Sequence, residues 1–349
     1  MRRSLAGILL FSITALSADA QVLSARDSIR NTHIRRYSDR FSIWPVLKQR
    51  SLSFDVSSKA QPNGNLTFRP NNAFSFGIGT YIFDVSAEVS LSIPLNEKSR
   101  TRFGVSEARD LSTSLAGTNW AMDAFVQRYE SFYLSNPGKA VPANQSYPLR
   151  SDIRLTNFGS NGIYVFDRNK FSLWSSYSFS ERQIKSHGSA LLAWTLNSVH
   201  LTADSVVLSP AYLARLNTPT NFSDVRYSTF GLAPGYSYNV IWKKVFLNVS
   251  LAVGPAHHWV YYVGGDGVAH YDIAINTFVD ARIALGYSSD RWFGGITFVS
   301  QSRAVKFEEI TLETQSQAFR MLVGYRIIEK GFLKKSWRDF VPVAIRRYL

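Results

Sequence analysis

The residues from Asp84 to Ile93 read DVSAEVSLSI and alternate strictly between polar and apolar side chains. Neighbouring side chains of an extended strand point to opposite faces, so such a strand separates an apolar medium from a polar one. The same period returns in residues 244–254, where Val245, Leu247, Val249, Leu251 and Val253 oppose Phe246, Asn248, Ser250 and Ala252. A closed barrel in an outer membrane presents such strands to lipid and pairs every backbone group. We therefore predict an all-β, transmembrane antiparallel β-barrel.

The first twenty residues have the pattern of a secretory signal peptide. Arg2 and Arg3 precede an apolar run at 5–16, and Ala18, Asp19 and Ala20 form a small-x-small cleavage pattern. We expect residues 1–20 to be removed by cleavage before Gln21. An exported chain with alternating strands is predicted to reside in the outer membrane.

The sequence contains no cysteine. This excludes disulfides, thiolate metal sites, cysteine nucleophiles and a lipid anchor on a cleavage-site cysteine. After the signal, no segment offers the roughly 18 consecutive apolar residues that a spanning helix needs. We therefore expect the exported chain to cross the membrane by strands.

The composition agrees with a wall of alternating strands. Hydrophobic residues make up 45% of the chain and aromatic residues 14%, yet the mean hydropathy is close to zero because lipid-facing and lumen-facing positions average out. Removing residues 1–20 lowers the formal charge from +14 to +13. A basic chain favours anionic neighbours. We expect as partners outer-membrane lipids with anionic phosphates and the outer-membrane assembly machinery, and no nucleic acid.

The strand pattern predicts an outer-membrane barrel over residues 41–328 with about 12 strands, and counts from 10 to 14 are compatible with the pattern. Most segments reach the roughly 9 to 11 residues that a tilted spanning strand needs. The expected strands are 41–47, 51–58, 73–82, 84–93, 109–117, 121–133, 150–167, 170–182, 186–200, 225–240, 244–256, 271–287, 291–303 and 308–327.

The order of these strands conflicts at one point with the usual loop arrangement. Barrels have short turns on the periplasmic side and long loops outside. Counting back from the last strand places loops 201–224 and 257–270 outside, but places the long loop 134–149 in the periplasm. Either a strand is miscounted or one loop is unusual. A turn at 157–162 could split one strand, or the first hairpin could lie outside the wall.

Two flanks fall outside the strand pattern, and we expect both to be periplasmic. Residues 21–40 are polar, and residues 329–349 form a basic tail that also contains aromatic side chains. The tail is interpreted as a segment that covers the barrel end or lies on the inner leaflet. The alternative is a motif that docks on another envelope component.

Six phrases of the chain resemble, in order, an uncharacterised family of Bacteroidota outer-membrane proteins, domain of unknown function 4421. Together they span residues 68–327, and the resemblance implies a barrel fold without a known reaction. The phrases are FRPNNAFSFGIGTYIFD at 68–84, QRYESFYL at 127–134, YVFDRNKFS at 164–172, RQIKSHGSALLA at 182–193, GYSYN at 235–239 and VGYRI at 323–327.

The strongest candidate for catalysis is the segment 182–189, which leads into a strand. If Ile184 and Ala190 face lipid, then Gln183, Lys185, His187 and Ser189 face the lumen. His187 and Ser189 could then act as base and nucleophile of a lipid hydrolase, with an orienting Asn or Asp from a neighbouring strand, such as Asn197, Asn248 or Asp280. A solvated lumenal cluster is the simpler interpretation, and we expect no catalytic residues.

Charged residues also recur on the polar phase of other expected strands. We predict that Glu88, Asp280, Arg282, Arg320 and Arg326 face the lumen, alongside Asp123, Arg154, Arg226 and Glu308. Mutual pairing of such residues can fill a lumen of this size without a ligand. The alternative is a path for a small anionic or amphipathic molecule.

Three histidines, His257, His258 and His270, flank an expected loop with the sequence HHWVYYVGGDGVAH. Imidazoles with nearby carboxylates can hold zinc or copper, but adjacent histidines are poorly placed to reach one ion. We expect no metal and no cofactor. Trp259, Tyr261 and Tyr262 are interpreted as an interfacial aromatic belt.

The sequence therefore favours a non-enzymatic outer-membrane protein that binds or passes a small molecule, or stabilises the envelope through lipid contacts. The rival hypothesis is a barrel-embedded lipid hydrolase that uses Ser189 and His187. A third class is a structural partner of another envelope component, recognised through the basic tail.

Overall fold

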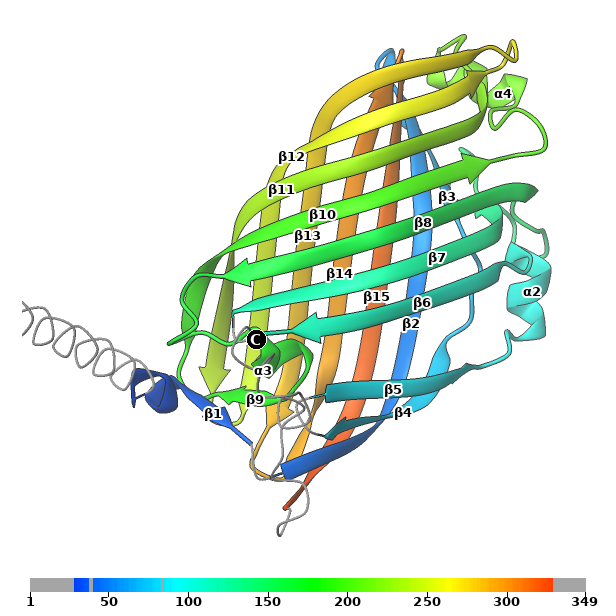
Figure 1. Ribbon diagram of the computed structural model, residues 1–349. Helices are drawn as coiled ribbons and strands as arrows, with labels where there is room; N and C mark the ends of the chain where they lie inside the picture. The colour runs from blue at the N-terminus through cyan, green and yellow to red at the C-terminus, as the bar shows by residue number, and fades with distance from the viewer. Residues whose placement is uncertain (1–27, 38–39, 83–84, 118, 329–349) are drawn as a thin grey trace, which may run out of the picture.

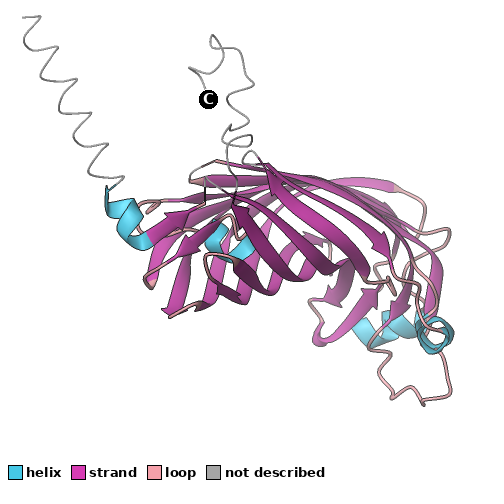
Figure 2. Ribbon diagram, turned by 90° about the horizontal axis from the view of Figure 1, so that it is seen from below, coloured by secondary structure: helices cyan, strands magenta, loops and turns pink. Residues whose placement is uncertain are grey.

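The computed structural model describes residues 28–37, 40–82, 85–117 and 119–328, in which strands dominate (Figures 1 and 2). The strands are β1 (Ile34–Arg36), β2 (Arg40–Ser58), β3 (Gln61–Arg69), β4 (Ser75–Ile82), β5 (Val85–Ser92), β6 (Glu107–Ala116), β7 (Trp120–Leu134), β8 (Leu149–Val165), β9 (Glu181–Gln183), β10 (His187–Thr202), β11 (Phe222–Trp242), β12 (Val245–Gly264), β13 (Ala269–Ser288), β14 (Trp292–Phe307) and β15 (Ile310–Ile328). The helices are α2 (Glu97–Phe103), α3 (Trp174–Tyr177) and α4 (Pro210–Leu216).

Ten antiparallel strands close a barrel in the order β2, β3, β7, β8, β10, β11, β12, β13, β14 and β15, with β15 pairing back to β2. Strands β4, β5 and β6 extend this sheet, and β1 pairs with β9 apart from it. The expected antiparallel barrel is confirmed, and its ring has ten strands, fewer than the twelve favoured but within the expected range of 10 to 14. We call the end where β2 begins and β15 ends the terminal end, and the opposite end the loop end.

The outer face of the wall is apolar, as the two-residue period predicted. On β5, Val89 and Leu91 are exposed, while Glu88 on the other phase is partly buried. On β12, all five predicted outward residues are exposed, and Phe246, Asn248, Ser250 and Ala252 are buried inside the barrel. The alternation therefore identifies the lipid-like and lumenal faces correctly on both strands.

The structure corrects the expected strands near the chain's start and middle, and it excludes one alternative, the turn at 157–162. Residues 41–47 and 51–58 belong to one strand, β2, which lies in the wall, and β3 was not expected. Strand β8 runs through 157–162 without a turn. Segment 170–182 is not a wall strand but contains α3 and β9. Because 170–182 does not cross, loop 134–149 lies at the same end as loop 203–221, which removes the conflict in the count.

Segment 170–182 imitates a strand because Phe171 and Leu173 alternate with serines. In the structure Ser172, Ser175 and Ser176 are buried as well as Phe171 and Leu173. A segment that is buried on all sides has no face for lipid, so it folds inward instead of crossing. A backbone φ of 57° at Phe179 turns the chain after α3.

The barrel interior near the loop end is filled by an apolar core. Its largest members are fully buried rings that include Phe54, Phe68, Phe132 and Phe222. Val207, Leu208 and Leu216 of the loop between β10 and β11 pack into the same cluster. Each such side chain contributes about 1.5–3 kcal/mol of burial free energy.

Segment 166–186 closes the terminal end from the inside, and Figure 2 shows its helix α3 within the strands. Tyr177 donates a hydrogen bond to Asn248 Oδ1 at 2.8 Å, and Ser176 donates to Asn239 Oδ1 at 2.9 Å. Phe179 packs against the rings of Phe246 and Phe293. We call this segment the plug.

The predicted signal peptide 1–20, residues 21–27 and 38–39 of segment 21–40, and the basic tail 329–349 lie outside the described residues. Within the described part of the chain, no helix is long and apolar enough to cross a membrane.

Candidate functional site

Two strands of the sheet are paired along one edge only. β5 pairs with β4 and β6 pairs with β7, and no pairing joins β5 to β6 among the described residues. The two strands follow each other in the chain, but α2 connects them in place of a tight turn (Figure 1). We call the space between these unpaired edges the β5–β6 gap. Unpaired backbone edges do not face hydrocarbon in membrane barrels, so these two edges are candidates for contact with a further polar group.

One side of the gap is organised by Glu88 of β5. Its carboxylate accepts a hydrogen bond from the Trp44 indole at 2.9 Å, forms an ion pair with Arg320, and lies 3.6 Å from Lys48 Nζ. Trp44 reaches Glu88 across Gly79 of β4, where a Cβ would come within 2.2 Å of the indole. Glycine at position 79 is therefore required by this close approach.

An ion pair connects the two sides of the gap. Arg50 of β2 donates to Asp110 of β6 at 2.7 Å and to the hydroxyl of Ser112 at 2.6 Å. The other Asp110 oxygen accepts from Gln127 at 2.7 Å and from the Tyr129 hydroxyl at 3.3 Å. Because β2 belongs to the β4–β5 side and β6 to the β7 side, this network spans the gap.

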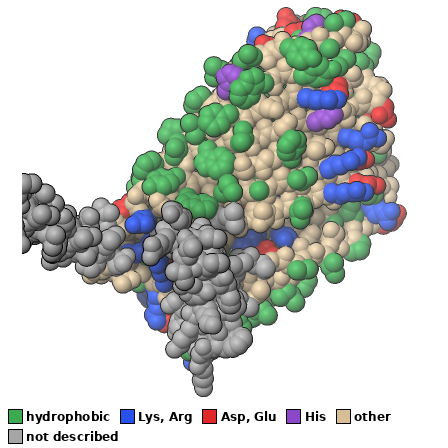
Figure 3. All heavy atoms as spheres, viewed as in Figure 1, with side chains coloured by type: hydrophobic (Ala, Val, Ile, Leu, Met, Phe, Trp, Pro, Cys, Tyr) green, Lys and Arg blue, Asp and Glu red, His purple; other side chains and the backbone are tan. Residues whose placement is uncertain are grey.

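The charged side chains of the gap remain accessible. Lys48, Arg50 and Arg320 are 28%, 35% and 21% exposed, and Glu88 and Asp110 are less so. Three cations therefore face two carboxylates. In Figure 3, charged side chains are visible between the apolar side chains over β5 and the wall over β6.

The lumen beyond the gap is tightly packed with polar groups. Asp280 pairs with Arg282 at 2.7 Å and accepts from Gln301 at 2.6 Å; Asp280 is buried, and the Arg282 side chain is 10% exposed. Arg303 is fully buried and donates to Asn161 Oδ1 at 2.7 Å and to Thr195. These groups satisfy one another, so we do not place the ligand site there.

Gln183, Lys185 and Arg326 lie at the terminal end. Gln183 is buried within the plug and accepts from the Ser172 amide at 2.8 Å, whereas Lys185 is exposed between β9 and β10. Arg326 is buried and donates to the carbonyls of Phe179 and Ser289 at 2.7 and 2.6 Å. It attaches the plug to the wall.

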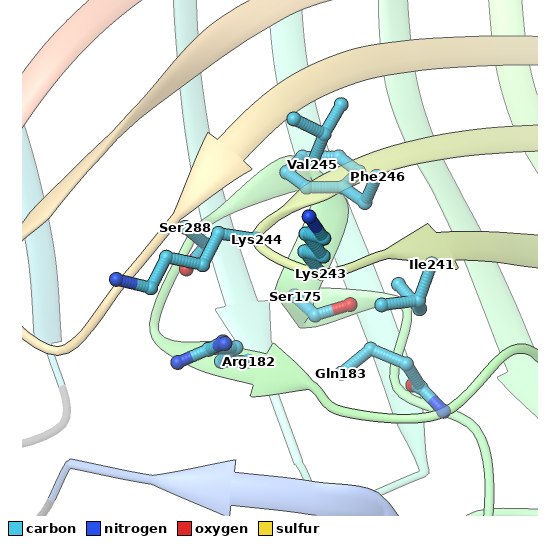
Figure 4. Close-up of a pocket in the computed structure, with 9 residues that line it drawn as sticks. All are labelled: Ser175, Arg182, Gln183, Ile241, Lys243, Lys244, Val245, Phe246 and Ser288. Carbon is cyan, nitrogen blue, oxygen red and sulfur yellow. The ribbon is translucent and has the colours of Figure 1, made fainter.

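A shallow depression lies beside the plug, and Figure 4 shows nine residues around it, among them Arg182, Lys243 and Lys244. Its volume of about 220 Å³ extends into open solvent. Ligand sites usually enclose about 300–1,000 Å³. The depression is therefore small and open for a ligand site.

The structure places His187 and Ser189 on one strand with separate partners. His187 Nε2 lies 3.0 Å from Asp167 Oδ2. The Ser189 hydroxyl donates to the Ala190 carbonyl at 2.7 Å and accepts from the Asp167 amide at 2.9 Å. The hydroxyl is thus occupied by the backbone, while catalysis requires a serine hydroxyl that donates to the base.

We expect Ser189→Ala and His187→Ala to leave folding and any lipid-hydrolysing background unchanged. The measurement is fatty-acid release from phosphatidylcholine micelles, with heat-modifiable gel migration as the folding control. A nucleophile and its base act as a unit, so either single change would remove nearly all activity. Native hydrolysis that disappears in both folded variants would contradict this prediction.

The three histidines lie on strands instead of in a loop. His258 is buried and its Nδ1 is 2.9 Å from the Thr229 hydroxyl, whereas His257 packs on Trp259. His270 stacks on Tyr262. Tyr262 points inward and donates to Glu308 at 2.7 Å, so only Trp259 and Tyr261 of the expected belt face outward. Within the described residues, no group of three or more His, Cys, Asp or Glu is arranged to hold a metal.

Sequence reasoning found Glu88 and Arg320 but missed Lys48, Arg50 and Asp110. The one signal in the sequence was the long connection between the expected strands 84–93 and 109–117. Neighbouring strands that pair with each other are usually joined by a tight hairpin or by a loop outside the bilayer. That connection did not reveal that the two strands stay apart. The pairing partner of an edge is a long-range property that local periodicity does not contain.

Comparisons with known proteins identify a family and distant barrels. The family model described as "Domain of unknown function (DUF4421)" matches residues 25–327. No curated protein matches the chain. The match supports the resemblance seen in the sequence, while a Bacteroidota source stays a prediction.

Solved barrels resemble the chain only weakly. The translocator domain of the autotransporter NalP from Neisseria meningitidis is 9% identical, with 90% of this chain and 98% of that chain covered and a TM-score of 0.34. The toluene transporter TodX of P. putida is 10% identical, with 82% and 90% covered and a TM-score of 0.25. TM-scores this low carry no argument about function.

Proposed function

The chain belongs to the DUF4421 family, which has no assigned function, and from its structure we propose an outer-membrane barrel that binds an amphipathic molecule with an anionic head at the β5–β6 gap. The observation that carries the proposal is the pair of unpaired strand edges beside an accessible charged cluster. The proposal concerns binding and includes no reaction.

The outer-membrane location is supported by the apolar outer face. Large exposed hydrophobic side chains cover every side of the wall; they include Phe76, Phe158, Leu196, Leu232, Leu251, Ile275, Leu285 and Val323. A soluble monomer rarely exposes apolar area on this scale. The expected signal peptide would direct such a chain through the periplasm to the outer membrane.

The borders of the gap have the chemistry of an amphipathic ligand. Val89 and Leu91 of β5 and Leu111 of β6 are 76%, 78% and 75% exposed. These apolar side chains flank the gap on its outer face, where an acyl tail would lie. Lys48, Arg50 and Arg320 inside the gap supply the positive charges for an anionic head.

Access from the side is favoured because both ends of the barrel are filled. The apolar core occupies the loop end and the plug occupies the terminal end. A small molecule that passes along the axis would have to displace one of these packed layers. The gap is the route that requires no such displacement.

The proposal is tested by cross-linking the gap. Ser90 of β5 and Ser112 of β6 lie on the inward phase of their strands. Since the chain has no cysteine, Ser90→Cys/Ser112→Cys can be joined selectively by a short bismaleimide. We expect cross-linking to weaken binding of dansyl-undecanoic acid in detergent micelles at least about tenfold, equivalent to 1.4 kcal/mol.

The matched control is Ser198→Cys/Ser228→Cys, because these residues are directly opposite on β10 and β11, away from the gap. Its cross-link should leave binding unchanged. Arg50→Gln, which keeps the chain uncross-linked, should also weaken binding several-fold. The proposal would be overturned if Ser90→Cys/Ser112→Cys bound dansyl-undecanoic acid equally well before and after cross-linking. It would also be overturned if Arg50→Gln bound this ligand as tightly as the native protein.

A further inference from the structure

A row of charged side chains crosses the outer face of five strands near the loop end. Figure 3 shows it as a stripe of blue, red and purple beside the green apolar surface. The row consists of Arg109 on β6, Arg128 and Glu130 on β7, Arg154 on β8, His200 on β10, and Asp224 and Arg226 on β11. We call these seven residues the charged row.

The charged row lies at the edge of the apolar surface. Along β6 and β7, the next outward residues toward the terminal end are Leu111, two positions beyond Arg109, and Val126, two positions before Arg128, and both are exposed. Two residues of a strand span about 7 Å. In a membrane, the row is therefore at the level of the lipid headgroups.

Aromatic side chains continue the row at the same level. Arg226 is directly opposite Tyr261 of β12, and Tyr261 is directly opposite Tyr271 of β13. Tyr271 is strongly exposed, and so is Trp259 one outward position away from Tyr261. Exposed Tyr and Trp are enriched where a barrel wall meets the membrane interface. The aromatic residues thus give independent support for the level of the row.

Between β6 and β7, unlike between β7 and β8, the charges are not arranged as complementary pairs. Arg109 is directly opposite Arg128, and Glu107 is directly opposite Glu130. Like charges in directly opposite positions destabilise a sheet. A wall selected only for its own stability would place opposite charges there, so an additional anion is expected between the two arginines.

The two carboxylates of the row pair with basic residues of the row other than Arg109. Glu130 binds Arg128 at 2.6 Å and lies 3.6 Å from Arg154. Asp224 binds Arg226 at 3.1 Å and lies 3.2 Å from His200. Among the described residues Arg109 forms no ion pair, so its guanidinium is available to an external anion.

We propose that the charged row binds phosphate groups of outer-leaflet lipids, with one phosphate bridging Arg109 and Arg128. Guanidinium groups bind phosphate through paired, charge-assisted hydrogen bonds. The inference rests on the proposed membrane location but not on ligand binding in the β5–β6 gap. Because Arg109 and Asp110 are neighbours on β6, the row would hold lipid headgroups beside that gap.

The test compares lipid A carrying its phosphates with the same lipid A after dephosphorylation. The full-length protein is kept in dodecylmaltoside micelles, and its thermal midpoint is followed by heat-modifiable migration as each lipid is added. We expect phosphorylated lipid A to raise the midpoint of the native protein, and the dephosphorylated form to leave it unchanged. Arg109→Gln/Arg128→Gln should need at least tenfold more lipid for half the effect.

The matched control is Lys98→Gln/Arg100→Gln, which removes the same charge from exposed positions of α2. It should respond like the native protein. The single variant Arg109→Gln, which breaks no recorded ion pair, should reproduce part of the loss and guards against misfolding of the double variant. The inference is overturned if dephosphorylated lipid A acts as well as the phosphorylated form, or if the Arg109 variants respond like the native protein.

Discussion

Val249→Arg is expected to destabilise the barrel by about 2–4 kcal/mol, the usual cost of an outward arginine at the middle of a membrane barrel. Val249 is 50% exposed on β12 between two other exposed apolar residues, Leu247 and Leu251. The measurement is urea unfolding of protein refolded into lipid vesicles, followed by tryptophan fluorescence.

The control for Val249→Arg is Ser228→Arg, which is also outward but lies at the level of the aromatic residues, opposite Trp259. Arginine costs only about 0–1 kcal/mol near the interface. The sequence alone suggests that Asn248→Arg is a tolerated lumenal control, but Asn248 is fully buried and bonds Tyr177, Ser237 and Asn239. We therefore expect Asn248→Arg to be destabilising too. If Val249→Arg and Ser228→Arg lowered the free energy of unfolding by equal, small amounts, this would contradict an apolar surrounding for the wall.

Asp280→Asn is expected to cost about 3–5 kcal/mol, because it leaves the Arg282 charge buried without its partner. The Asp280 and Arg282 side chains are 3% and 10% exposed and lie 2.7 Å apart. In the same urea measurement, Asp280→Asn/Arg282→Gln should lower the free energy of unfolding less than Asp280→Asn alone, since the double change removes both buried charges.

The control for the buried pair is Asp152→Asn, whose partner Arg150 is bound at 2.8 Å but more exposed. A more exposed pair contributes about 0–1 kcal/mol. If Asp280→Asn lowered the free energy of unfolding no more than Asp152→Asn does, the lumen would have to be well hydrated. That result would also reopen the lumen as a place for a ligand.

Local periodicity predicted the parts of the fold that are repeated along single strands. The outward phases of β5 and β12 follow from alternation at positions such as Val89 and Val249, because the period of two is a property of one extended chain. The inward placement of Glu88, Asp280 and Arg320 follows from the same rule. Their partners do not, since an ion pair such as Glu88–Arg320 joins residues from distant segments.

The errors concern features that depend on pairing and closure. Segment 170–182 alternates like a strand, and only the burial of both its apolar and its serine side chains shows that it belongs inside. The histidine segment looks like a loop because of its glycines, yet β12 and β13 remain paired up to Val263 and Ala269. The gap was missed for the same reason, because each edge strand has an ordinary sequence and lacks only a neighbour.

The strands of the sheet differ greatly in length, and in the proposed membrane location this shapes the surrounding bilayer. β12 has 20 residues, whereas β5 has 8, which corresponds to about 27 Å along its own axis. Once tilted, β5 is shorter than the apolar band of about 25 Å that outer-membrane barrels usually present. Lipids beside β5 must compress to match it, at a fraction of a kcal/mol per Å of mismatch. The protein would therefore carry a thinned patch of bilayer on one flank, where lipid headgroups approach the gap most closely.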